Sequence, residues 1–321
     1  MQFIPYVLHV VNQLSEGGCT VTLCALDISK AFDRVNFYGL LNLLMDRAFP
    51  KCMINLLLDW LTKGVECVRW AGSISTSFHI FAGVRQGGLL SPMLFAVYMD
   101  NLISRLRASG LGCNLHGVYY GCLVYADDVM LISRSVTVMQ RMLAICDMFA
   151  VDLDVKFNTV KSVAIRIGKR YKVNCADLTL SGNKLVYVQS VKYLGVYIKS
   201  AKHFKCTYEH VKIKFFRAFN AIYSKSKASR SELVSVELLK SYCLPTVLYA
   251  TETSGPTKQD VNSLNNCINL AVMKIFGVRS TSSVTDLRLY LGLTDLHVLI
   301  SNRAHKFIEN LSDIPLFGVL T

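Results

Sequence analysis

Three aspartates of this 321-residue chain stand where apolar stretches end. Asp27 follows the run Val21–Leu26, and Asp127 and Asp128 form the polar tip between two short apolar runs in Cys122–Ile132. A carboxylate in such a place needs a cation or a partner to stay charged. Carboxylates on neighbouring strands could hold two Mg²⁺ ions ~3.5–4 Å apart, which would stabilise the attacking and leaving oxygens of a phosphoryl transfer. The alternative is structural, because adjacent acids in a hairpin are more often turn formers than ligands.

Helical and strand patterns alternate along the part of the chain that carries these acids. The spacing of apolar residues, with Gly and Pro as breaks, predicts helices over 3–15, 36–47, 51–61, 91–106 and 136–150. Alternating or continuous apolar runs predict strands over 21–26, 65–70, 76–84, 155–157, 162–167, 178–180 and 185–198, with a turn over 181–184. Beyond Ser200 the pattern is helical only, near 207–227, 231–244 and 257–276. An α+β domain over 1–199 followed by a helical region over 200–321 is therefore expected.

The charge of the chain is concentrated in one region. Lys and Arg number 35 against 22 Asp and Glu, a net charge of +13. The stretch from Val155 to Arg230 holds 17 Lys or Arg and only two acids, so it accounts for the whole excess. A polyanion such as nucleic acid is the usual partner of such a surface, and a solvated face that maintains solubility is the alternative.

Cysteine usage and hydropathy indicate where the protein works. The eleven cysteines show no CxxC pair, and the start of the chain lacks the pattern of a signal peptide, which favours reduced thiols over a secreted disulfide framework. His203, Cys206 and His210 lack a convincing fourth ligand for zinc. No uninterrupted apolar run approaches the ~20 residues that cross a bilayer. An intracellular protein, cytoplasmic or nuclear, with no membrane partner is expected.

Five blocks of the sequence stand out together, and they are Leu26–Asp33, Arg85–Pro92, Tyr125–Asp128, Asn158–Ser162 and Val191–Val196. In the same order, they resemble the blocks of reverse transcriptases from non-LTR (LINE-type) retrotransposons. The third, Tyr-Ala-Asp-Asp, is the form most diagnostic of reverse transcriptases. The resemblance runs continuously from about Leu14 to Lys199 and more loosely through the helical region.

This resemblance implies an RNA-directed DNA polymerase with an antiparallel palm sheet, packed helices and a helical thumb. Its partners would be an RNA template, a DNA primer and deoxynucleoside triphosphates, and its cofactor two Mg²⁺ ions, with Mn²⁺ as a possible substitute. Asp27 and Asp127 correspond to the principal metal ligands, with Asp128 in support, and Asp33 to a structural residue. Lys161 corresponds to a candidate general acid for the pyrophosphate leaving group, and its alternative is a phosphate-contacting or solvated lysine.

The resemblance also implies residues that select the nucleotide. Phe32 would be a steric gate against the ribose 2′-hydroxyl; its alternative is a core Phe at a helix start. Gln86 and Gly87 would line the nucleotide and template site, where a missing side chain lets a base pair approach. A tight loop before the next helix is the other reading of this pair. Arg85 would meet template or phosphate, or else lie on the surface.

Two further sets of residues would hold the nucleic acid. Tyr193, Leu194 and Gly195 resemble the primer grip, although the Tyr and Leu could equally be core residues. A helix after residue 200 would track the backbone of the hybrid duplex. The basic residues assigned to that track are Lys205, Lys212, Lys214, Arg217, Lys225 and Lys227.

The sequence departs from the family in what precedes the first block. Only about 20 residues stand there, so the fingers, whose basic residues clamp the triphosphate, are expected to be largely missing, along with an endonuclease domain and a cysteine-rich tail. Two hypotheses follow, a polymerase and a noncatalytic nucleic-acid-binding remnant. The intact acids favour the first, and the missing fingers favour the second. The pattern does not indicate an oligomeric state.

Overall fold

A computed structural model describes residues 3–226 and 231–312 of the chain, which fall into two compact units. We call the first the sheet unit; it comprises His9–Tyr193 and Lys199–Phe204. The second, the helical unit, comprises the residues up to Leu8, Leu194–Ile198 and the chain from Lys205 onward. Helix α1 (Phe3–Glu16) has residues in both.

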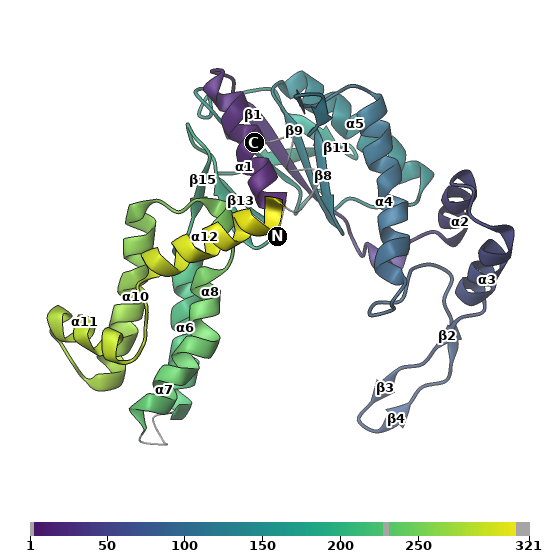
Figure 1. The fold of residues 1–321 in the computed structure, drawn as a ribbon. Coiled ribbons are helices and arrows are strands. Elements are labelled where there is room, and N and C mark those ends of the chain that lie inside the picture. Colours follow the sequence, from purple (N-terminus) through teal and green to yellow (C-terminus); the bar gives the residue numbers. More distant parts are fainter. Residues whose placement is uncertain (1–2, 227–230, 313–321) are drawn as a thin grey trace. The chain divides into compact units, whose positions relative to one another are not determined.

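A six-stranded sheet forms the centre of the sheet unit (Figure 1). Its strands follow the order β11-β12-β10-β1-β9-β8. Their bounds are Val21–Asp27 for β1, Cys122–Tyr125 for β8, Asp128–Ser133 for β9, Val163–Ile167 for β10, Leu178–Leu180 for β11 and Asn183–Tyr187 for β12. The antiparallel sheet implied by the resemblance is wrong in one place, because β10 and β12 pair in parallel. The returning strand of the β11–β12 hairpin, rather than its first strand, lies beside β10, and this makes the sheet mixed.

The helices of the sheet unit begin and end close to the predicted positions. They are α2 (Phe37–Asp46), α3 (Lys51–Thr62), α4 (Ser91–Ala108) and α5 (Val136–Asp152). Local chemistry explains several of these starts. The Asn36 side chain accepts the Gly39 N–H at 2.9 Å, and the Ser135 side chain accepts the Val138 N–H at 3.4 Å. Pro92 lies in the first turn of α4, where it removes no helical hydrogen bond.

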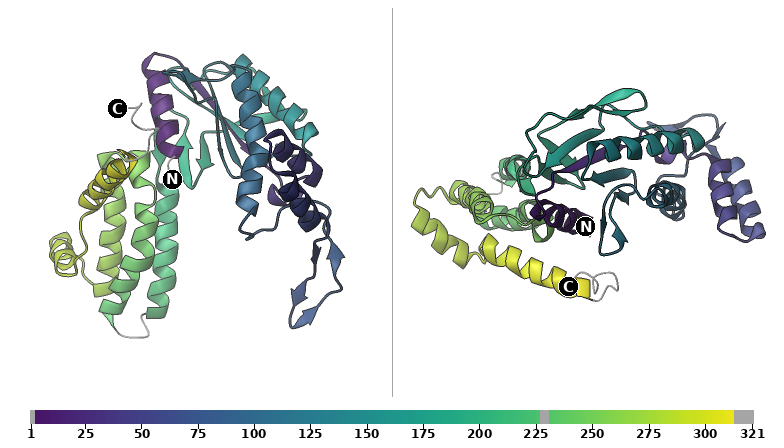
Figure 2. Two further views of the ribbon diagram at one scale, coloured as in Figure 1. Left: turned by 45° about the vertical axis from the view of Figure 1, so that its right-hand side comes forward. Right: turned by 90° about the horizontal axis from the view of Figure 1, so that it is seen from above.

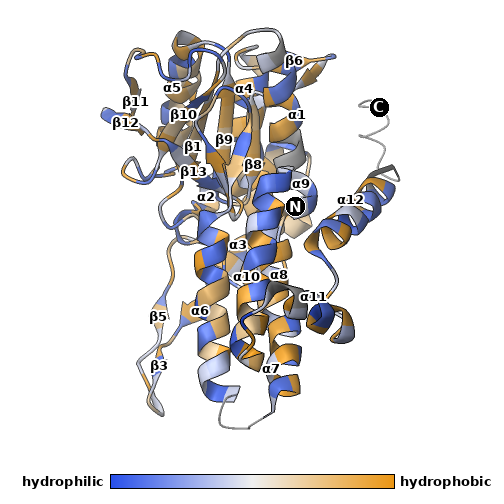
Figure 3. Cartoon of the chain, turned by 90° about the vertical axis from the view of Figure 1, so that its left-hand side faces the viewer, coloured by the Kyte–Doolittle hydropathy of each residue, from blue (hydrophilic) through white to orange (hydrophobic). Residues whose placement is uncertain are grey.

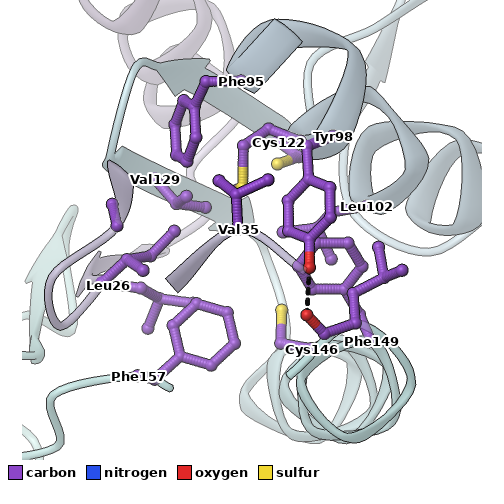
Figure 4. Packing of buried hydrophobic residues seen from close by; sticks show 14 of the residues in the cluster. Leu26, Val35, Phe95, Tyr98, Leu102, Cys122, Val129, Cys146, Phe149 and Phe157 are labelled. Carbon is purple, nitrogen blue, oxygen red and sulfur yellow. Dashed lines mark hydrogen bonds between the residues drawn. The ribbon is translucent and has the colours of Figure 1, made fainter. Parts of the chain in front are cut away.

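Helices α4 and α5 cover one face of the sheet and form the main core with it (Figure 4). Tyr98, Leu102 and Phe149 are fully buried in this core, and each such side chain contributes about 1.5–3 kcal/mol through burial. The Tyr98 hydroxyl donates to the Leu153 carbonyl and accepts the Asn36 N–H at 3.2 Å. One tyrosine therefore joins α4 to the end of α5 and to the start of α2.

Several predicted strands are shorter than expected. Instead of strands over 65–70 and 76–84, two small ribbons form, β2 (Val65–Glu66) with β5 (Phe78–His79) and β3 (Arg69–Trp70) with β4 (Ser73–Ile74). The β3–β4 ribbon extends beyond α2 and α3 (Figure 2). Positive φ angles at Ala71 and Gly72 form its turn, and its residues are exposed, so no core face prolongs the strands. The predicted strand at 155–157 is only a bridge between Phe157 and Ile28.

The region from 185 to 198 also differs from the prediction of one strand. It divides into the end of β12, β13 (Ser190–Tyr193) and most of β14 (Val196–Lys199). Leu194 and Gly195 have positive φ angles of 46° and 81°, which end β13. A further short ribbon, β6 (Asn114–Leu115) with β7 (Val118–Tyr119), was not predicted.

The helical unit is helical apart from β14 and β15 (Lys205–Thr207), and the second of these corrects the expectation of helices alone after Ser200. Hydrophilic and hydrophobic residues alternate along its helices, whereas the central strands of the sheet unit are mainly hydrophobic (Figure 3). Its helical elements are α6 (Glu209–Ser226), α7 (Glu232–Leu238), the π-helical turn η3 (Leu239–Cys243), α8 (Leu244–Leu248), α9 (Thr251–Ser254), α10 (Lys258–Phe276), α11 (Thr281–Tyr290) and α12 (Leu296–Ser312). The predicted helices near 207–227 and 257–276 correspond to α6 and α10.

One segment in the described part of the chain, Glu232–Ser254, is long and apolar enough to cross a membrane by length and composition alone. A single segment of this kind is weak evidence, because core helices meet the same criterion. The backbone also leaves the helical conformation within it, since Tyr249 is extended and Ala250 has a φ of 57°. All eleven cysteines are free thiols.

Candidate active site

The pairing of β1 with β9 brings together the acids that the sequence singled out. Asp27 at the end of β1 is the register partner of Asp128 at the start of β9, although 101 positions separate them. Tyr125 of β8 also pairs with Asp128, so Ala126 and Asp127 form a two-residue hairpin tip. Ala126 holds a φ of 51°, which residues other than Gly, Asn and Asp rarely adopt. The hairpin tip thus has an unusual backbone conformation at Ala126. It carries Asp127 and lies next to Asp128 and its partner Asp27.

The fourth block wraps around Asp27. Its Ser162 hydroxyl accepts the Asp27 N–H at 3.1 Å, and its Asn158 N–H donates to the Asp27 carbonyl at 2.8 Å. The Asn158 side chain in turn accepts the Lys161 N–H at 3.3 Å, and the Lys161 ammonium lies 3.8 Å from the Asp27 carboxylate. The block was recognised in the sequence, but no role was given to Asn158 or Ser162. The sequence feature that could have pointed to them is that both are small polar residues near Lys161, one before it and one after it.

Electrostatic strain is concentrated at Asp128. Partial burial raises the pKa of the Asp128 carboxyl, the nearby Asp127 and Asp27 raise it further, and Lys192 lowers it. Carboxylates that repel one another in this way would be stabilised by a bound cation. Lys192 was not singled out in the sequence, because its strand position gives no sign of a carboxylate nearby.

The chemistry of this group of donors fits a hard cation. Carboxylate oxygens are the ligands that Mg²⁺ and Mn²⁺ prefer. Across residues 3–226 and 231–312, however, no three His, Cys, Asp or Glu side chains gather closely enough to hold a metal ion as they stand. Coordination would therefore need the side chains of Asp27, Asp127 and Asp128 to turn toward a shared ion.

A cavity of about 480 Å³ opens beside Asp27 and Asp127, within the usual size range of ligand sites, and Asp128 is not among its lining residues. Five of the predicted residues line it, namely Asp27, Phe32, Gln86, Asp127 and Lys161. The half-buried Phe32 ring stacks on the buried Phe95 of α4, with ring centroids 4.6 Å apart and an angle of 23° between the planes. The ring is therefore held from behind at the wall of the cavity and is also partly a core residue.

The second block lies at the edge of the same cavity. The Gln86 side-chain amide donates to Asp33 Oδ1 at 3.1 Å. Gly87 has a φ of 80°, and no atom lies within 4 Å of where a Cβ would be, so its missing side chain leaves open space. Arg85 does not line this cavity; it lines a neighbouring one of about 510 Å³, which Gln86 and Asp33 share.

The predicted primer grip falls in both units. Tyr193 of the sheet unit is buried, and its burial, together with the charge of Asp128, raises its pKa. In the helical unit, the Tyr249 hydroxyl donates to the Leu194 carbonyl at 3.1 Å. Gly195 has a φ of 81°, which favours glycine, and a Cβ there would lie 2.8 Å from the Tyr249 ring. At 2% exposure, the Tyr193 side chain is buried as a core residue is.

The basic residues predicted after residue 200 differ in their surroundings. Lys214, Arg217 and Lys225 are exposed on α6, and their spacing places them on one side of the helix. We call these three residues the basic stripe. Lys212 is half-buried and pairs with Glu209 at 2.9 Å, and Lys205 is exposed on β15. Lys227 lies outside the described residues.

Comparison with known proteins assigns a family to this architecture. Residues 5–198 match the family model described as reverse transcriptase (RNA-dependent DNA polymerase). The chain is 24% identical over 315 residues to a Pol polyprotein from the type-1 retrotransposable element R2 of Popillia japonica, covering 96% of this chain and 49% of the relative. It is 25% identical over 300 residues to the RNA-directed DNA polymerase from the mobile element jockey of Drosophila melanogaster, covering 90% and 32%. The chain thus spans about half of the first relative's length and about a third of the second's.

A solved structure shows a similar fold. Telomerase from Candida albicans, in complex with a fragment of telomeric RNA, matches 91% of this chain and 53% of its own with a TM-score of 0.51. The two sequences are 11% identical, so the likeness concerns the fold alone.

Proposed function

Because this chain belongs to the reverse transcriptase family, whose members are RNA-dependent DNA polymerases, and is related at about 25% identity to enzymes of non-LTR retrotransposons, we propose that it extends a DNA primer on an RNA template. The substrates would be deoxynucleoside triphosphates. The sheet unit would act as the polymerase palm and the helical unit as the thumb. The whole relatives are longer than this chain, so the proposal concerns the polymerase reaction only.

The observation that carries the proposal is the register of β1 against β9. Pairing Asp27 with Asp128 sets two carboxylates at one end of the sheet, and the adjoining hairpin tip adds Asp127. These three residues would hold two divalent ions, which when bound supply charge stabilisation for the attacking 3′-oxygen and the leaving pyrophosphate. In the chain itself, the Ser162 and Asn158 hydrogen bonds fix the backbone of Asp27, and so fix where its carboxylate begins.

The residues around the cavity have separate proposed tasks. Phe32, supported by Phe95, would exclude the 2′-hydroxyl of a ribonucleotide from the space beside Asp27. Lys161 would carry a proton for the departing pyrophosphate, and its ion pair with Asp27 places its ammonium at the cavity. Gln86 and Gly87 would bound the base pair, with the open side of Gly87 as the point of close approach.

A second candidate function is nucleic-acid binding without turnover. The exposed basic stripe of α6 favours it, because three exposed long cations on one helix face suit a phosphate backbone whether or not chemistry follows. This candidate shares the fold and the partners of the first and differs only in catalysis.

Primer extension separates the two candidates. The chain of residues 1–321 would be given an RNA template, a labelled DNA primer, deoxynucleoside triphosphates and Mg²⁺. We expect template-directed extension that ceases with a chelator and falls by about 10³-fold in Asp127→Asn, with duplex binding unchanged. Binding without any extension would support the second candidate. Equal extension by Asp127→Asn and the parent would contradict the proposed site.

A further inference from the structure

The loop that carries Gln86 is joined to the segment that carries Phe32 by a short backbone seam. The Val84 N–H donates to the Phe32 carbonyl and the Gly83 N–H to the Val35 carbonyl, both at 2.8 Å. Gly83 has a φ of 99°, and a Cβ there would lie 2.8 Å from the Asp33 carbonyl oxygen. The two segments, about 50 residues apart in sequence, are therefore in direct backbone contact.

One side-chain bridge continues this seam toward the cavity. Asp33 follows Phe32 in the 3₁₀ turn η1 (Phe32–Arg34), and its Oδ1 accepts the Gln86 amide N–H at 3.1 Å. A carboxylate can only accept, so it must take the nitrogen of the Gln86 amide. The amide oxygen is then turned away from Asp33. The bridge thus decides which end of Gln86 is offered to a ligand.

The position of Gln86 gives this orientation a consequence. Gln86 lines both the cavity of Asp27, Phe32 and Asp127 and the neighbouring cavity that contains Asp33. Its side chain therefore belongs to the wall between the two cavities. Asp33, which lines the second cavity, holds it by the hydrogen bond described above. An amide oxygen fixed in this way is an acceptor for the hydroxyl and N–H donors of a nucleotide, with its orientation set before binding.

We propose that Asp33 is a positioning residue for nucleotide binding, which acts through Gln86 by holding its side-chain amide in one orientation at the wall of the cavity beside Asp27. This role rests on the proposed polymerase function and deepens it. It differs from a structural role of Asp33 in η1, because it predicts an effect on nucleotide affinity that disappears when Gln86 is absent.

The test measures nucleotide binding without chemistry. Residues 1–321 would be mixed with Ca²⁺, an RNA template and a DNA primer that lacks its 3′-hydroxyl, and the next complementary deoxynucleotide would be titrated. The readout is the nucleotide concentration that protects half of the protein–duplex complex from a heparin challenge. We expect Asp33→Ala and Gln86→Ala each to raise it about tenfold, as loss of one charge-assisted bond would.

The double variant and two controls decide the interpretation. If Asp33 acts through Gln86, Asp33→Ala/Gln86→Ala should match Gln86→Ala alone. Asp33→Asn keeps an acceptor oxygen and should stay within about threefold of the parent. Asp100→Ala removes a comparable exposed bridge, the 2.6 Å contact with Arg47, and should change nothing.

Each remaining outcome counts against the inference or against the function. Unchanged affinity in Asp33→Ala, effects that multiply in the double variant, or loss of folding in Asp33→Ala would overturn the positioning role. A parent that shows no nucleotide-dependent protection would overturn it as well. A parent that binds nucleotide through Asp33 and Gln86, yet never extends a primer with a 3′-hydroxyl, would instead refute the proposed function and leave the inference standing.

Discussion

The acidic end of the sheet unit and the basic stripe of the helical unit have opposite charge, and they are also constructed differently. Asp27 and Asp128 owe their positions to strand register. The backbone of Asp27 is held further, because its N–H donates to the Ser162 hydroxyl and its carbonyl accepts the Asn158 N–H. Lys214, Arg217 and Lys225 owe theirs only to helical spacing, and their long side chains are exposed. The backbone that carries the acids is therefore fixed by pairing, while the stripe offers charge on long side chains without fixed geometry.

This difference predicts how each region responds to substitution. Where backbone geometry sets a group, one substitution should remove a whole function, since no neighbour can take its place. Where long exposed side chains supply charge, single losses should be small and roughly additive. Four experiments test this contrast, and the first targets the acids themselves.

The largest effect is expected at Asp27. Asp27→Asn keeps the size of the side chain but removes the charge that would hold a metal ion, and should lower kcat for primer extension by about 10³-fold, near 4 kcal/mol. Asp128→Asn should cost only about tenfold, because its carboxyl is partly buried and already crowded by two acids that raise its pKa. Single-turnover extension on an RNA template measures both. A larger loss in Asp128→Asn than in Asp27→Asn would reverse the assigned roles.

The second effect concerns the backbone that supports the site. Gly83→Ala would place a Cβ 2.8 Å from the Asp33 carbonyl oxygen at a φ of 99°, and should lower the free energy of unfolding by roughly 2–4 kcal/mol. Gly72→Ala is a matched control, because Gly72 also has a positive φ, of 84°, but no atom within 4 Å of its Cβ position. It should cost only about 1 kcal/mol. Urea denaturation measures both, and equal losses would mean that the close approach at Gly83 adds nothing.

The third effect is a change of selectivity at Phe32. Phe32→Ala removes the ring that stacks on Phe95 and should raise ribonucleotide incorporation relative to deoxynucleotide by about 10–100-fold. The ratio of kcat/KM for the two sugars is the measurement. Phe95→Leu should shift the ratio in the same direction by less, since the gate ring remains but loses its support. An unchanged ratio in Phe32→Ala would leave Phe32 as a core residue.

The contrast also explains what could be predicted from sequence. Asp27 and the Asp127–Asp128 pair could be found because strand ends and hairpin tips leave a local pattern, and most helices of the sheet unit were predicted from helical periodicity and caps. The bridge from Asp33 to Gln86 could not, because it joins residues 53 positions apart and no local pattern pairs the two side chains.

Other features depended on packing that a single sequence does not display. In the β11–β12 hairpin, β12 lies beside β10, and this makes the pairing parallel. The apolar pattern of the two hairpin strands would be the same if β11 lay there instead, so the sequence does not show which one does. The expected strands at 65–70 and 76–84 had apolar residues, yet Trp70 and Phe81 are 80% and 86% exposed, so no core extended them. β15 was missed because Lys205–Thr207 is too short for periodicity to register.

The smallest effect is expected at the basic stripe, and it locates the nucleic-acid surface. Replacing Lys214, Arg217 and Lys225 by Gln removes three exposed cations from one face of α6 and should weaken duplex binding about tenfold at 100 mM salt, near 1.4 kcal/mol. If each of them neutralises one phosphate, the slope of log affinity against log salt should fall by about 2–3. Extension at saturating duplex should be unchanged.

Replacing Lys169, Arg170 and Lys172 by Gln is the control, because it removes three exposed cations from the sheet unit within the same basic stretch. A stripe-specific track predicts little effect there, whereas equal losses in both triple variants would mean that general charge, and not α6, attracts the duplex.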